Sequence, residues 1–93
     1  MAKTLPNISV GNNDWINLAT ASGMTEGDAL MIQNITTNPV IVAMQDAKPD
    51  AASTSGYYLP QYESYRVTSA QGIWIKSMGY SRSTVSLFSG TDI

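Results

Sequence analysis

The chain has 93 residues, which is enough for one domain and not for two. With 43% hydrophobic and 13% charged residues it is too apolar to be disordered, and its net charge of −2 argues against nucleic-acid binding, which needs clustered Lys and Arg. Cysteine and histidine are absent, which excludes disulfides, thiolate metal sites and a histidine base.

The beginning of the chain predicts a strand at the border of a sheet. Residues 1–10 are expected to form an N-terminal arm or edge strand, and residues 11–93 a single β-sandwich domain. Leu5–Val10 contains Pro6, which cannot donate to a ladder and is tolerated only at an edge. This strand either pairs within its own sheet, which is the preferred alternative, or adds to the open sheet edge of a neighbouring subunit.

A second short strand is predicted at Trp15–Leu18. Because side chains alternate along a strand, Ile16 and Leu18 are expected to face inward. Trp15 is then placed on a second, partly exposed apolar surface. The following segment, Ala19–Asp28, is predicted to be a loop because it is too short for a stable helix.

The clearest pattern lies between Gly27 and Pro60. Ala29–Ile32 is a short apolar run, Gln33–Asn38 is a polar connection, and Pro39–Met44 is a second apolar run. This pattern predicts one β-hairpin. The long polar stretch that follows, Asp46–Gly56, is expected to be either mobile or held by a neighbouring element.

Short β-branched or aromatic runs continue to the end of the chain, each bounded by turn-forming residues. They lie at Tyr57–Leu59, Tyr65–Val67, Ile73–Met78 and Thr84–Phe88. About seven to eight short antiparallel strands at this spacing predict an all-β fold, a single small β-sandwich or a jelly-roll-like barrel.

The residue types available for catalysis are few. A pair of carboxylates is the only plausible machinery, and such a pair would come from Asp14, Glu26, Asp28, Asp46, Asp50 and Glu63. Each of these lies in or beside a predicted turn, where acidic side chains usually cap backbone N–H groups. We therefore expect no enzyme, no catalytic residues, no metal site and no cofactor.

Aromatic side chains are the more informative group, because Tyr and Trp are enriched in strands and at interfaces. Stacking on sugars or unpaired bases is the alternative, and bases would need more basic neighbours than the chain offers. The candidate partner-interface residues are Leu5, Ile8, Val10, Trp15, Tyr57, Tyr58 and Tyr62.

Taken together, the strand pattern resembles that of small accessory virion proteins of tailed bacteriophages, the group that decorates capsids or lines head, neck and tail structures. The likeness spans nearly the whole chain. The segments that carry it are Trp15–Leu18, Gly27–Asn34, Pro39–Val42, Gly56–Pro60 and Ile73–Ile75.

The resemblance implies a non-enzymatic structural protein of a phage virion, a capsid decoration or cement subunit present in many copies and homo-oligomeric. Its implied partners are the major capsid protein or other virion proteins. The implied location is the virion, assembled in the host cytoplasm, and the chain has neither a signal-peptide pattern nor an apolar run of membrane-spanning length. The alternative is a structural or host-glycan-binding module of the tail, neck or a fibre.

Overall fold

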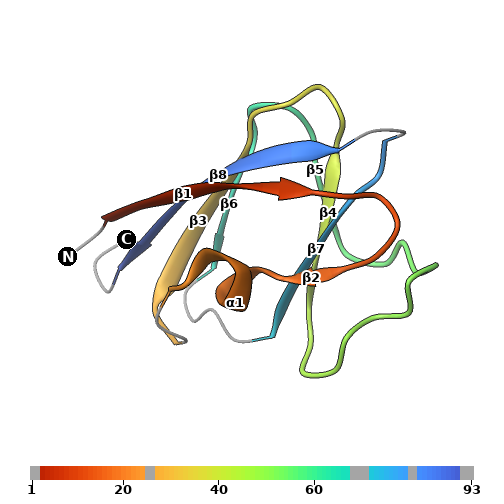
Figure 1. Cartoon of the computed structure of the whole chain (residues 1–93), viewed down its shortest axis with the longest axis horizontal. Coiled ribbons are helices and arrows are strands. Elements are labelled where there is room, and N and C mark those ends of the chain that lie inside the picture. Colours follow the sequence, from red (N-terminus) through yellow and green to blue (C-terminus); the bar gives the residue numbers. More distant parts are fainter. Residues whose placement is uncertain (1–2, 25–26, 68–71, 80–81, 91–93) are drawn as a thin grey trace.

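The structure is a computed structural model, and it describes residues 3–24, 27–67, 72–79 and 82–90. Within these ranges the chain forms eight strands in two four-stranded sheets, with one short helix, α1 (Leu18–Ser22) (Figure 1). Sheet A contains, in spatial order, β1 (Lys3–Val10), β8 (Ser83–Gly90), β3 (Ala29–Asn34) and β6 (Ser64–Val67). Sheet B contains β2 (Ile16–Asn17), β7 (Ile73–Ser77), β4 (Val40–Met44) and β5 (Tyr57–Leu59).

The strand order follows from one long antiparallel hairpin that is rolled up. β1 pairs with β8, β2 with β7, β3 with β6 and β4 with β5. Rolling then brings β3 beside β8 and β4 beside β7, which completes the two sheets. This is the topology of a jelly roll, so the predicted all-β sandwich or jelly roll is confirmed.

The predicted hairpin between Ala29–Ile32 and Pro39–Met44 is wrong, although both strands exist. β3 lies in sheet A and β4 in sheet B, so the connection between them crosses from one sheet to the other. The buried amide of Asn34 holds this crossing, because its Nδ2 donates to the carbonyl oxygens of Asn38 (2.8 Å) and Leu59 (3.1 Å). A connection between two sheets and a hairpin turn within one sheet have the same polar composition. The sequence pattern therefore does not distinguish them.

The N-terminal strand β1 is an edge strand of sheet A and pairs with β8 of its own chain. Its register shifts between Leu5 and Ile8, the interval that contains Pro6. A proline cannot donate to the ladder, and a bulge on an edge strand removes the need for that hydrogen bond. The preferred alternative for this segment, pairing within its own sheet, is therefore the observed one.

The strand predicted at Trp15–Leu18 is shorter than expected, because the chain turns into α1 at Leu18. Asn17 caps the helix, since its Oδ1 accepts a hydrogen bond from the Thr20 N–H at 3.1 Å. Gly23 ends the helix in a left-handed conformation with a φ of 73°. The prediction of a loop at Ala19–Asp28 is thus wrong for its first residues, which form this single helical turn.

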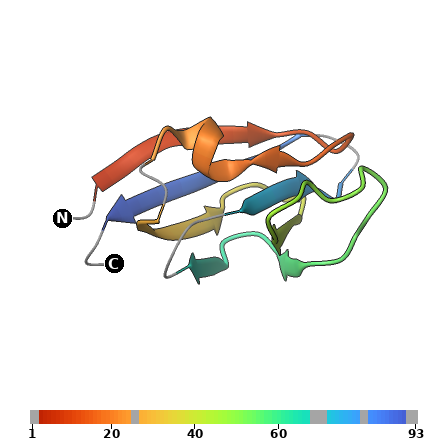
Figure 2. The same cartoon turned by 90° about the horizontal axis from the view of Figure 1, so that it is seen from below.

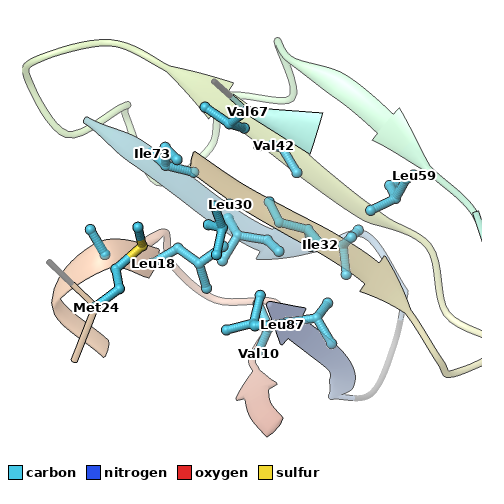
Figure 3. Packing of buried hydrophobic residues seen from close by; sticks show 14 of the residues in the cluster. Val10, Leu18, Met24, Leu30, Ile32, Val42, Leu59, Val67, Ile73 and Leu87 are labelled. Carbon is cyan, nitrogen blue, oxygen red and sulfur yellow. The ribbon is translucent and has the colours of Figure 1, made fainter. Parts of the chain in front are cut away.

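The hydrophobic core lies between the inner faces of the two sheets (Figure 3). Side chains alternate along β7 and β8, and Ile73, Ile75, Val85 and Leu87 on their inner faces are all completely buried. α1 adds Leu18 to the same cluster. In Figure 2, β1, α1 and β2 lie along one side of the sandwich, and β5 and β6 lie along the opposite side.

Candidate interaction surface

The β5 and β6 side of the sandwich carries three exposed tyrosines, which we call the tyrosine edge: Tyr57, Tyr58 and Tyr62. Tyr57 and Tyr58 belong to β5, the edge strand of sheet B, and Tyr62 belongs to the connection between β5 and β6. Their exposed fractions are 45%, 54% and 67%. All three were predicted from the sequence as interface candidates.

Alternation along β5 directs the first two rings differently. Tyr57 lies on the same strand face as the buried Leu59, and its ring stacks on Tyr65 of β6 with a centroid distance of 4.4 Å and an interplanar angle of 23°. This stack joins the two sheets at their open side. Tyr58 lies on the opposite strand face, so its ring points away from the core.

Tyr62 has an unusual backbone. Its φ of 67° places a non-glycine residue in the left-handed region, which costs about 1–2 kcal/mol. The conformation is held by its N–H, which donates to the Asn34 carbonyl oxygen, and by its own carbonyl oxygen, which accepts from Gln33 Nε2 at 3.1 Å. The ring itself gains little from folding because it is the most exposed of the large hydrophobic side chains described.

Three of the predicted interface residues belong to β1 and not to the tyrosine edge. Leu5 and Val10 are buried in the core of their own domain, with 6% and 0% of their surface exposed, and Ile8 is half-buried against that core. These β1 side chains stabilise the sandwich itself.

The predicted exposure of Trp15 is wrong, because only 2% of its surface is accessible. Its side chain is on the outer face of sheet B, as alternation suggested, where it forms a second cluster with Ile41, Ala43 and the half-buried Trp74. The connection 45–56 lies over this face, and the Asp50 carbonyl oxygen accepts from Trp15 Nε1 at 3.0 Å. Of the two alternatives for the polar stretch Asp46–Gly56, the one in which a neighbouring element holds it matches these contacts.

The outer face of sheet A presents mainly hydroxyl and amide groups. One row across it pairs Thr4 with Phe88, Phe88 with Met31, and Met31 with Arg66. Phe88 is 46% exposed, and among the described residues of this sheet it is the one exposed large hydrophobic side chain; sequence reasoning did not select it. Its position opposite Val85 and Leu87 in the strand alternation was the signal that identifies it as outward-facing.

The acidic side chains of the described residues lie mainly in exposed connections. Asp14, Asp46, Asp50 and Glu63 are exposed in connections, Asp28 is half-buried, and Glu26 lies outside the described residues. In the same part of the chain no cluster of three or more potential metal ligands occurs.

Asp14 is the acid whose environment is most defined. Lys48 Nζ donates to its Oδ2 at 2.5 Å, and the Trp15 backbone N–H donates to its Oδ1 at 2.8 Å. These two hydrogen bonds lower the pKa of the Asp14 carboxyl below its usual value, the Lys48 contact having the larger effect. The folded structure therefore stabilises the ionised form of the Asp14 carboxyl.

An open pocket of about 240 Å³ is lined by Asn12, Thr54, Lys76, Ser77, Met78 and Gly79. It is smaller than the roughly 300–1,000 Å³ of typical small-molecule sites. No helix in the described ranges is long and apolar enough to cross a membrane. Comparisons with protein-family models, with curated proteins and with solved structures gave no match.

Proposed function

We propose that the chain is a non-enzymatic structural subunit of a tailed-phage virion, a decoration or cement protein that attaches to the particle in many copies through its tyrosine edge. Its partner is the major capsid protein or another virion protein, and its location is the virion assembled in the host cytoplasm. The jelly-roll fold is compatible with this role and with many others. The support for the proposal must therefore come from the exposed residues of the tyrosine edge.

The observation that carries it is Tyr62, whose exposed ring sits on a backbone that disfavours any side chain. Residues held in sparsely populated backbone conformations occur often at functional positions, and the ring carried by this backbone is 67% exposed. Tyrosines are also enriched at the centres of protein interfaces, where their rings bury a large area at a small entropic cost. Tyr57 and Tyr58 extend the same edge.

Weak contacts are sufficient for such a subunit. A surface of hydroxyl and amide groups is cheaper to desolvate than one of charged groups, and attachment as an oligomer multiplies each contact through effective concentration. The edge strands β5 and β6 are short, with three and four residues, which limits uncontrolled strand addition.

The proposal is tested on particles produced by the genome that encodes the chain. After banding in a density gradient, mass spectrometry is expected to find the chain in the particle fraction at a fixed ratio to the capsid protein. Finding it only in the soluble fraction would reject the virion role. Light scattering of the pure protein at high concentration tests the homo-oligomer, and a monomer would count against that part.

The second candidate is a tail, neck or fibre module that binds a host glycan, and the exposed rings of Tyr58 and Tyr62 favour it because aromatic faces stack on sugars. Trp15, being buried, does not contribute to such a site. Glycan-array screening of the native chain beside Tyr58→Ala distinguishes the two: a sugar bound by the native chain and lost in the variant supports the glycan module, and no bound glycan rejects it.

A further inference from the structure

Tyr62 lies in the tight turn that joins β5 to β6, residues 60–63, which we call the β5–β6 turn. The Glu63 N–H donates to the Pro60 carbonyl oxygen at 3.2 Å, and this hydrogen bond closes the turn. Tyr62 is the third residue of the turn and has a φ of 67°. A positive φ at this position is typical of a type II turn, where glycine or asparagine is favoured. The chain thus carries a large exposed ring at a position that usually holds a small residue.

The end of β3 holds the β5–β6 turn through three further hydrogen bonds. Two of them join main-chain groups: the Tyr62 N–H donates to the Asn34 carbonyl oxygen at 2.5 Å, and the Asn34 N–H donates to the Glu63 carbonyl oxygen at 3.3 Å. In the third, Gln33 Nε2 donates to the Tyr62 carbonyl oxygen at 3.1 Å. The backbone of Tyr62 is therefore bound to β3 on both sides of its Cα, which fixes the direction in which the ring leaves the chain.

Gln33 is the residue that makes this contact with a side chain. It lies in β3 between the buried Ile32 and Asn34 and is itself half-buried, so alternation places its side chain on the outer face of sheet A. It is not a member of the core cluster. Its hydrogen bond to Tyr62 is exposed, and an exposed hydrogen bond adds little to the stability of a fold because water competes for both groups. The local effect of Gln33, on the backbone of Tyr62, is therefore the larger one.

We propose that Gln33 is a positioning residue of the attachment surface, and that it holds Tyr62 in the conformation in which the ring meets the partner. This inference rests on the proposed function, since it concerns the same tyrosine edge. A turn that is ordered before binding loses less conformational entropy when the partner binds, so its order contributes to affinity. Gln33 acts on the partner only through Tyr62, and the β5–β6 turn enters the interface without rearrangement.

Three variants test this role. Gln33→Met keeps the length of the side chain and removes the donor, whereas Gln33→Lys keeps a donor at a similar distance from the backbone. Gln45→Met is the matched control, because Gln45 Nε2 also donates to a main-chain carbonyl oxygen, that of Ala47 at 2.7 Å, in a different connection. Three quantities are measured for each protein: the hydrogen-exchange rate of the Tyr62 N–H by NMR, the midpoint of urea denaturation, and the dissociation constant for phage particles that lack the chain.

In Gln33→Met the Tyr62 N–H is expected to exchange about tenfold faster than in the native chain, and the dissociation constant for particles to rise about tenfold. The urea midpoint is expected to equal that of Gln45→Met. Gln33→Lys is expected to restore most of the protection and of the affinity, and Gln45→Met to leave both at their native values. A residue that served only the stability of the fold would change the urea midpoint and would not act selectively on Tyr62.

Two results would overturn the proposal by themselves. If the Tyr62 N–H exchanges equally fast in Gln33→Met and in the native chain, Gln33 does not hold the turn. If Gln33→Met exchanges faster but binds particles as tightly as the native chain, the conformation of the turn is not used in attachment, and the proposed function stands. Native protein that does not bind particles rejects the proposed function, and this inference with it, so the two failures are distinguishable.

Discussion

Asn34 is a residue whose structural importance far exceeds what its polarity suggests. It is fully buried at the crossing between the sheets, where its Oδ1 accepts from the Thr36 backbone N–H and hydroxyl at 3.0 Å each, and its Nδ2 donates to two carbonyl oxygens. Each buried partner that loses its hydrogen bond costs about 1–3 kcal/mol.

Asn34→Ala is therefore expected to lower the free energy of unfolding by about 3 kcal/mol. Urea denaturation measures it, with Asn13→Ala, at an exposed position in a connection, as the control that should change stability by no more than about 0.5 kcal/mol. Equal effects of the two substitutions would show that the crossing does not depend on this amide.

Tyr62 gives the opposite expectation. Asparagine tolerates the left-handed conformation better than tyrosine, so Tyr62→Asn should leave the free energy of unfolding unchanged or raise it by up to about 1 kcal/mol. Tyr65→Asn, which removes the ring that stacks on Tyr57, is expected to lower it by about 2 kcal/mol. A clear loss of stability in Tyr62→Asn would mean that the ring serves the fold, and it would remove the main support for the tyrosine edge as the attachment surface.

The Asp14 carboxyl provides a test by pH. Since its pKa is lower in the folded chain than in the unfolded chain, its contribution is present above the usual Asp range and is lost as the pH falls through the lowered pKa. Lys48→Met should raise the pKa of Asp14 toward its usual value, and Lys48→Arg should keep it low. NMR titration of the carboxyl measures both, and an unchanged midpoint in Lys48→Met would refute the assigned cause.

At the scale of elements, local patterns predicted most strands and failed to predict their partners. Runs such as Val40–Ala43 are visible in the sequence, but the same run suits a hairpin arm or a strand that crosses to the other sheet. The run is apolar on both faces because Ile41 and Ala43 lie under the connection 45–56, while Val40 and Val42 face the core. Unbroken apolar character is the one sequence signal that a strand is covered on both sides.

The residues of the tyrosine edge were predictable from the sequence, but the burial of Trp15 was not. Tyr58 and Tyr62 follow from composition, because aromatic rings in a chain without histidine or cysteine suggest contact with partners more than they suggest catalysis. The burial of Trp15 did not follow, since it depends on the Asp50 carbonyl oxygen, which lies 35 positions further along the chain. When a residue is buried by a segment that is distant in the sequence, the hydrophobic pattern around that residue does not show it.

Gly72 lies very close to Gln45, the first residue of the connection between β4 and β5. The Gln45 N–H donates to the Gly72 carbonyl oxygen at 2.9 Å, and a Cβ on Gly72 would collide with the Gln45 carbonyl oxygen. Gly72 also has a φ of 59°.

Gly72→Ala is expected to lower the free energy of unfolding by more than about 2 kcal/mol, because it combines a clash with left-handed backbone. Gly23→Ala is the matched control: its φ is 73° but nothing lies within 4 Å of an added Cβ, so it should cost only about 1 kcal/mol. Thermal or urea denaturation compares them. Similar losses for both would show that the approach to Gln45 is not tight in solution.

For the whole molecule, the rolled hairpin explains how a chain without disulfides forms a stable sandwich. Its first strand, β1, pairs with its last, β8, within sheet A, and the core is closed on one side by α1. The opposite side is closed by the Tyr57–Tyr65 stack, which leaves the tyrosine edge exposed beside it. We therefore place the proposed attachment surface on this side, and the residues that stabilise the fold in the rest of the molecule.

Binding to particles that lack the chain tests this assignment most directly. Native protein, the double variant Tyr58→Ser with Tyr62→Asn, and Phe88→Ser, which alters the exposed ring on the outer face of sheet A, are each mixed with such particles and separated on a gradient. We expect native protein and Phe88→Ser to sediment with the particles, and the folded double variant to remain unbound. Equal binding by the double variant and the native protein would contradict it.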